Sequence, residues 1–272
     1  MRVLSLAALT VLDLAPPAMV TCAAEAGYSH VGLRLVPATP TEPRYDSVGD
    51  TPLVREIRAR LDDTGVRVLD VEILRLTPQV RIDDFLPVLE TAARLGAANV
   101  LVAGNDPDES RLVDNFAALS DIALAFRIAP NLEPMPWTDV KSFADGARVY
   151  RRADRANAGL MIDPIHFDRA GSRAGEIADV PATWFRYAQI CDAPAQRPRD
   201  LDEMLNQARA ERLLPGDGGL DLAGIFAALP RDLPVSVEIP MQSLAHSLPA
   251  VERARRARIA SEALLATLPP RG

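Results

Sequence analysis

The 272-residue sequence has only two cysteines, no excess of basic residues and no low-complexity tract. Cys22 and Cys191 are too few for a disulfide framework and lack zinc-finger spacing, which indicates a reducing compartment and, by default, the cytoplasm. The net charge of −7 disfavours a nucleic-acid partner, because affinity for phosphate backbones depends largely on Lys and Arg. These shortages favour a protein that acts on a small molecule.

The apolar start of the chain has two interpretations. Arg2 precedes an apolar run over residues 3–12, as in a secretory signal, and Cys22 follows small residues. The run is short, however, and its cationic part is a single arginine. We therefore interpret it as the first strand of the fold, and we expect no membrane partner.

Apolar segments of strand type alternate with segments of helical period along the whole chain. Strands are expected near residues 2–10, 30–35, 66–76, 99–102, 128–132, 159–162, 187–191 and 234–237. Helices are expected near residues 16–26, 52–63, 82–95, 108–126, 138–152 (with Thr138 as cap) and 248–268. This alternation predicts one domain over residues 1–272, a single (β/α)₈ TIM barrel. An open doubly wound sheet is the alternative, but no Gly-x-Gly-x-x-Gly turn follows the first strand.

Three acidic residues stand where expected strands meet their loops. Glu133, Asp163 and Glu238 each end an apolar run, with a proline following shortly after. In a closed barrel the carboxyl ends of the strands surround one centre, so we expect these carboxylates to converge. Crowded buried carboxylates need a cation or protons to neutralise them. The pattern predicts a divalent metal site, although each acid alone could be a helix cap or a surface group.

Six segments carry motifs of a known family. They are Gly-Tyr-Ser-His-Val-Gly-Leu-Arg (27–34), Leu-Glu-Pro-Met-Pro-Trp (132–137), Asp-Pro-Ile-His (163–166), Gln-Ile-Cys-Asp (189–192), Leu-Pro-Gly-Asp-Gly (214–218) and Val-Glu-Ile-Pro (237–240). Over essentially the whole chain they resemble the sugar phosphate isomerase/epimerase group of xylose-isomerase-like TIM barrels. The motifs specify the superfamily well and the substrate poorly.

The resemblance implies that four residues hold a metal ion: Glu133, Asp163, Gln189 and Glu238. Members of the family usually have histidine where this chain has Gln189. Because an amide oxygen is a harder ligand than an imidazole nitrogen, an all-oxygen set favours Mn²⁺ or Mg²⁺ over Zn²⁺. Gln189 could instead orient a ligand or the substrate.

Further residues are candidates for binding substrate: His166, Arg197, Arg212, Trp137, Glu72 and Asn105. The resemblance implies that His166 contacts substrate oxygens; as a catalytic residue it would polarise one of them or relay a proton, although it could instead only hold its loop. Arg197 and Arg212 could anchor a phosphate or a carboxylate, because guanidinium forks suit planar anions, or could be surface arginines.

The activity implied by the resemblance is a metal-dependent isomerase or epimerase that works through an enediolate, with Glu133 and Glu238 as the acid/base pair. A dehydratase or other lyase of the same superfamily shares the first proton abstraction. A non-catalytic barrel subunit is the third alternative. An endonuclease for abasic DNA is disfavoured, because its multinuclear zinc site needs several histidines and the chain has three. The expected partner is a polyol, sugar or keto-acid, and homo-oligomers are left open.

Overall fold

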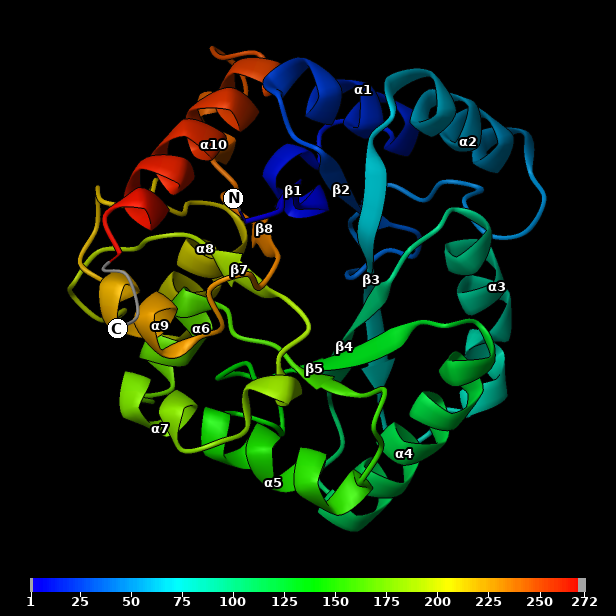
Figure 1. The fold of residues 1–272 in the computed structure, drawn as a ribbon, viewed down its shortest axis with the longest axis vertical. Coiled ribbons are helices and arrows are strands. Elements are labelled where there is room, and N and C mark those ends of the chain that lie inside the picture. Colours follow the sequence, from blue (N-terminus) through cyan, green and yellow to red (C-terminus); the bar gives the residue numbers. More distant parts are fainter. Residues whose placement is uncertain (1, 269–272) are drawn as a thin grey trace.

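Eight parallel strands form a curled sheet in the computed structural model, which describes residues 2–268 (Figure 1). The strands are β1 (Leu4–Leu6), β2 (His30–Arg34), β3 (Arg67–Leu76), β4 (Asn99–Gly104), β5 (Ala129–Glu133), β6 (Gly159–Leu160), β7 (Ala188–Ile190) and β8 (Val235–Val237). They pair in the order β6-β5-β4-β3-β2-β1-β8-β7. The backbone N–H of Gln189 donates to the carbonyl oxygen of Ile162 at 2.8 Å and so links the two edges of the sheet. The predicted TIM barrel is confirmed.

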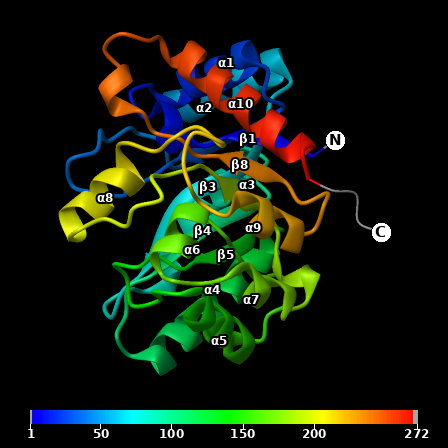
Figure 2. The same ribbon diagram turned by 90° about the vertical axis from the view of Figure 1, so that its left-hand side faces the viewer.

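Helices cover the outside of the sheet (Figures 1 and 2). They are α1 (Pro16–Ala26), α2 (Pro52–Thr64), α3 (Leu86–Arg94), α4 (Glu109–Ala125), α5 (Phe143–Ala153), α6 (Pro164–Arg169), α7 (Ala174–Ala178), α8 (Leu201–Arg209), α9 (Leu222–Ala228) and α10 (Ala250–Ala266). Proline stands in the first turn of α1, α2, α3 and α6, where its missing N–H leaves no hydrogen bond unmade. Within residues 2–268 no helix combines the length and the apolar character needed to cross a membrane.

Two predicted elements differ from the structure. The first strand is shorter than residues 2–10, because the chain turns after Leu6 into the 3₁₀ helix η1 (Ala8–Val11), where the Thr10 hydroxyl donates to the carbonyl of Val237 at 2.8 Å. Helix α5 begins at Phe143, not near 138. The predicted cap Thr138 instead donates its hydroxyl to nearby carbonyl oxygens in the loop.

The inside of the barrel is partly polar, unlike the apolar layer between sheet and helices. Five polar residues of the strands are 0% exposed: Ser5, Asp70, Asn131, Gln189 and Ser236. Gly32 on β2 makes room for one of them, because a Cβ at this glycine would lie 2.9 Å from Oδ1 of Asp70. The polar interior leads toward the carboxyl ends of the strands, which lie at the same end as α8 and the loop before α2 (Figure 2).

Candidate active site

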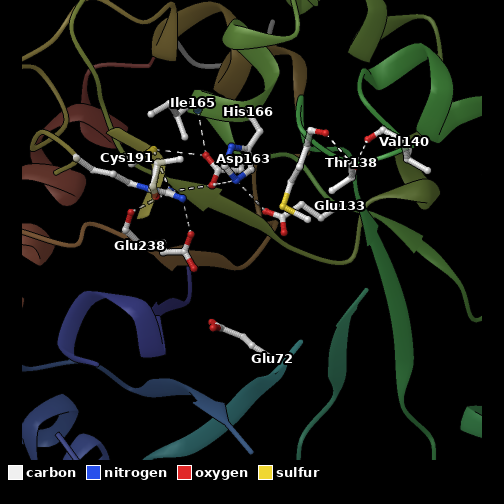
Figure 3. A network of polar contacts seen from close by, with 12 residues as sticks. Glu72, Glu133, Thr138, Val140, Asp163, Ile165, His166, Cys191 and Glu238 are labelled. Carbon is white, nitrogen blue, oxygen red and sulfur yellow. Dashed lines mark hydrogen bonds and ion pairs between the residues drawn. The ribbon is translucent and has the colours of Figure 1, made fainter. Parts of the chain in front are cut away.

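Glu133, Asp163 and Glu238 lie at the carboxyl ends of β5, β6 and β8, and none is more than 4% exposed. Asp163 is also the N-cap of α6, since its Oδ1 accepts the amide hydrogen of Ile165 at 3.0 Å. The short helix carries His166 back over the acids (Figure 3). Its Nε2 lies 3.5 Å from Oδ2 of Asp163 and 3.6 Å from Oε1 of Glu133.

Arg212 is buried between two of these acids, with its side chain only 1% exposed. Its guanidinium lies 2.7 Å from Oδ2 of Asp163 and 2.8 Å from Oε2 of Glu238. It also donates to the backbone oxygens of Ala208 and Glu238, at 2.7 and 3.1 Å. The alternative that Arg212 is a surface arginine is therefore wrong. Its charge balances two carboxylates in the site.

The cluster suits a divalent metal ion in its donor chemistry. One ligand atom each from Glu133, Asp163 and His166 lies within 4.8 Å of the others, close enough to surround one ion. On β7, Gln189 is fully buried, and neither its amide oxygen nor its nitrogen has a hydrogen-bond partner. Such an orphaned group is what a ligand or an orienting residue would show before its partner binds. The imidazole in the cluster weakens the all-oxygen argument against zinc.

Burial and neighbouring charges set the protonation of the cluster. Burial, followed by the charges of Asp163 and Glu238, raises the pKa of Glu133 well above its usual value. Burial also raises the pKa of Glu238 to about 8, against the opposing effect of Arg212. For Asp163 burial acts in the same direction, but Arg212 and then His166 outweigh it and lower the pKa. The site therefore combines an ionised aspartate with glutamates that can hold a proton.

His166 is neutral near neutral pH. Burial lowers the pKa of its imidazole to about 4, although the nearby charge of Asp163 opposes this effect. A neutral imidazole can donate a hydrogen bond from one nitrogen and accept one, or bind a metal, with the other. Its Nδ1 is buried without a partner, so this capacity is not used within the fold.

The cluster opens into a cavity of about 310 Å³. Its charged lining consists of three glutamates and four arginines: Glu42, Glu133, Glu238, Arg34, Arg75, Arg209 and Arg212. Arg34 binds Glu42 at 2.9 Å and Glu72 at 2.8 Å. Glu133 is thus the one lining glutamate that has no arginine partner among the described residues.

The remaining predicted substrate residues lie at different places around this cavity. Glu72 on β3 lies apart from the network of Figure 3 and is bound to Arg34. Asn105 follows β4 and accepts a hydrogen bond from Arg75 at 3.1 Å. Both predicted residues therefore contact the cavity through arginines that line it.

Trp137 and Arg197 are not part of the cavity lining. The ring of Trp137 meets that of His166 edge to face, with 4.8 Å between centroids. Arg197 is exposed and donates to the backbone oxygen of Asp168 at 2.8 Å.

Sequence reasoning missed three arginines of the cavity. Arg34 and Arg75 stand at the last and next-to-last positions of β2 and β3, so the rule that selected the acids at strand ends could have found them. Arg209 ends α8 in the long connection after β7, where no strand pattern marks it.

Comparison with known proteins agrees with this architecture. Residues 20–265 match the family model described as xylose isomerase-like TIM barrel. The chain belongs to this family. It is 29% identical over 186 residues to a 3-dehydroshikimate dehydratase from Pseudomonas aeruginosa. The matched region covers 64% of this chain and 29% of that protein. The chain therefore spans less than a third of the length of this family relative.

Solved structures of the same fold cover the chain more fully. The IOLI protein, solved with a bound zinc atom, superposes with a TM-score of 0.80 at 20% identity and covers 100% of both chains. The D-allulose 3-epimerase from Methylomonas sp. in complex with D-allulose has a TM-score of 0.70 at 17% identity, over 96% of each chain. At these identities both matches show the shared fold.

Proposed function

We propose that this member of the xylose isomerase-like family is a metal-assisted lyase. It would remove a proton from the carbon next to a ketone, and the resulting enolate would expel a hydroxyl group as water. The family relative named 3-dehydroshikimate dehydratase supports this reaction class. Because only 29% of that relative is matched, its substrate enters here as the first compound to test.

The observation that carries the proposal is the unequal state of the two glutamates. Glu238 is held by Arg212 at 2.8 Å, whereas Glu133 faces the cavity beside a neutral imidazole. An epimerase of the kind predicted from the sequence needs two bases, one on each side of the substrate. An elimination needs one base to take the proton and one donor for the leaving hydroxyl. Glu133 can serve as the base and His166 as the donor, while Glu238 stays paired with Arg212.

The residues have separate roles in this scheme. Glu133, ionised beside a bound cation, would take the proton, and the burial that raises its pKa makes its carboxylate more basic. His166 donates a hydrogen bond to the hydroxyl that leaves, and this hydroxyl takes up the proton that Glu133 removed from carbon, so that water departs. Arg212 fixes Asp163 and Glu238 in place. A divalent ion, when held by Glu133, Asp163 and His166, would act as a Lewis acid that stabilises the negative charge on the ketone oxygen.

Product analysis tests the reaction. The protein is incubated with Mn²⁺ and 3-dehydroshikimate in deuterated buffer, and the product is examined by mass spectrometry. We expect a product lighter by one water. Glu133→Gln should lose at least about a hundredfold in kcat, the range of a general base. The matched control Arg81→Gln removes an exposed charge outside the cavity and should keep the full rate.

An isomerase or epimerase is the second candidate, because Glu133 and Glu238 line the same cavity. In that case the product would not have lost water, and it would carry deuterium from the solvent on carbon. That result, with 3-dehydroshikimate or with a panel of ketoses, would contradict the lyase.

Metal content is a separate measurement. We expect about one divalent ion per chain after dialysis against Mn²⁺ or Zn²⁺, and its loss in Glu133→Gln. A protein that binds neither ion and converts none of these substrates would support the non-catalytic subunit.

A further inference from the structure

Two arginines that line the cavity have no acidic partner. Arg75 donates to Oδ1 of Asn105 at 3.1 Å and to the backbone oxygen of Ala38 at 3.4 Å. The guanidinium of Arg209 lies over the ring of Trp137, 5.3 Å from its centroid. Neither forms an ion pair with a carboxylate of residues 2–268. Both side chains therefore bring to the cavity a positive charge that no ion pair neutralises, although Glu42 acts on both from a distance.

The other two lining arginines are already neutralised. Arg34 binds Glu42 and Glu72, and Arg212 binds Asp163 and Glu238. Both guanidinium charges are balanced by acids of the fold, although Nε of Arg34 has no hydrogen-bond partner. An anion that enters the cavity would therefore be attracted most strongly to Arg75 and Arg209.

The charges of Arg75 and Arg209 act on each other. Both side chains are half-buried, and burial lowers the pKa of each guanidinium. The charge of Arg209 lowers the pKa of Arg75 further. Two like charges in a partly desolvated cavity cost free energy that an anion between them would recover.

We infer that Arg75 and Arg209 bind an oxyanion of the substrate, a carboxylate or a phosphate, in the cavity that holds Glu133 and His166. Guanidinium groups suit both anions, because their parallel N–H groups match two oxygens at once. This assignment replaces Arg212 and Arg197, the anchors suggested by sequence. It rests on the proposed function only in that the same cavity holds the reacting part of the substrate.

The anion would lie close to the proposed chemistry. Arg209 packs on Trp137, and the same indole contacts His166. Among the charges that raise the pKa of Arg75, that of Glu133 has the largest effect. A substrate small enough for about 310 Å³ could thus place its anion on the arginines and its ketone at Glu133.

Equilibrium binding tests this inference without any turnover. Benzoate, phenyl phosphate and the neutral isostere benzamide are titrated into the full-length protein, and dissociation constants are measured by ligand-observed NMR. We expect at least one anion to bind about tenfold or more tightly than benzamide. Arg75→Gln and Arg209→Gln should each weaken that anion by about ten- to a hundredfold and leave benzamide unchanged.

Two further variants serve as controls. Arg209→Lys keeps the charge and loses the fork, so it should retain part of the preference for anions. Arg81→Gln removes an exposed arginine outside the cavity and should bind all three probes like the unsubstituted protein. Thermal unfolding of each variant shows whether it is folded.

The outcomes separate the two anions and the two proposals. Tighter benzoate identifies a carboxylate site, and tighter phenyl phosphate a phosphate site. Equal binding of all three probes, or unchanged anion binding in both glutamine variants, would overturn the inference. Glu133→Gln should keep the preference for anions even though it abolishes catalysis, so failure of the lyase reaction leaves this test intact.

Discussion

Arg212 determines how the acids of the site can coexist. Because Asp163 and Glu238 are buried against one guanidinium, removing it leaves two carboxylates without a counter-charge. We expect Arg212→Met to lower the free energy of unfolding by about 3–5 kcal/mol, the cost of breaking a buried ion pair from one side. Urea denaturation in the presence of a chelator measures this change.

The matched control for this substitution is Arg199→Gln. Arg199 pairs with Glu203 at 2.9 Å, but its side chain is 81% exposed. Its loss should leave the free energy of unfolding almost unchanged, because water screens an exposed ion pair. If the two variants lose the same stability, the buried pair does not hold the site together.

At the residue scale the sequence predicted positions better than partners. Glu133, Asp163 and Glu238 could be placed at one rim because each ends an apolar run. The neutralisation of Asp163 and Glu238 by Arg212 could not be predicted, because Arg212 and Asp163 are 49 positions apart and meet only when the barrel closes. Arg75 could have been found at the end of its strand, whereas no strand pattern marks Arg209 at the end of α8.

The loop after β7 is an element organised by one carboxylate. Asp192 accepts the amide hydrogens of Ala193, Gly216, Gly218 and Leu220, at distances between 2.8 and 3.1 Å. The carboxylate of Asp192, the last residue of the Gln-Ile-Cys-Asp segment, therefore holds the Leu-Pro-Gly-Asp-Gly loop in place. A side chain at position 218 would collide with this arrangement.

Gly218→Ala tests this loop. A Cβ there would lie 2.3 Å from Oδ1 of Asp192 and from the backbone oxygen of Ala193. We expect a loss of about 1–3 kcal/mol in unfolding free energy from overpacking, measured by chemical denaturation. In Gly175→Ala the new Cβ meets no atom within 4 Å, and the exposed helical site should be neutral or gain up to about 1 kcal/mol. An equally stable Gly218→Ala variant would contradict the packing argument.

Helix α5 shows why its first residue was misplaced. Ser142 and Asp145 form a capping box, with the Ser142 hydroxyl 3.3 Å from the Asp145 amide and the Asp145 carboxylate 3.1 Å from the Ser142 amide. Thr138 is also a good cap by type. Only the fold shows that its hydroxyl is used by loop carbonyls, so sequence alone could not choose between them.

The cap has a measurable effect on stability. Ser142→Ala should lower the free energy of unfolding by about 1 kcal/mol, because the first turn of α5 loses an acceptor for its free N–H groups. Ser142→Asn keeps a capping side chain and should remain within a few tenths of a kcal/mol. Thermal unfolding of both variants compares them directly, and equal losses would show that the hydroxyl does not cap the helix.

At the scale of the whole molecule, the alternation of strands and helices was enough to predict a closed barrel. Strands shortened to two or three residues, such as β6 and β1, could not be delimited, because their pairing ends where loops fold into the mouth. The polar interior was hidden as well. Asp70 stands in an apolar run and looks like a single interruption until the closed sheet brings it inside.

That interior makes the stability of the protein depend on pH. Burial, then the charges of Glu72 and Glu238, raises the pKa of Asp70 well above its usual value. Native Asp70 therefore keeps its proton at a pH where the unfolded chain has lost it. Since the unfolded state then binds fewer protons, the stability contributed by this group is complete below the unfolded pKa, near 4, and falls as pH rises toward the folded pKa.

Asp70→Asn should remove this dependence, because asparagine resembles the protonated acid and can still accept from the Tyr187 hydroxyl, 3.4 Å away. We expect the variant to gain on the unsubstituted protein by up to about 1.4 kcal/mol for each pH unit between pH 5 and 7, measured by urea denaturation. Asp83→Asn makes the same substitution at an exposed position and serves as the control. A difference between Asp70→Asn and the unsubstituted protein that stays constant with pH would mean that native Asp70 ionises like the unfolded chain.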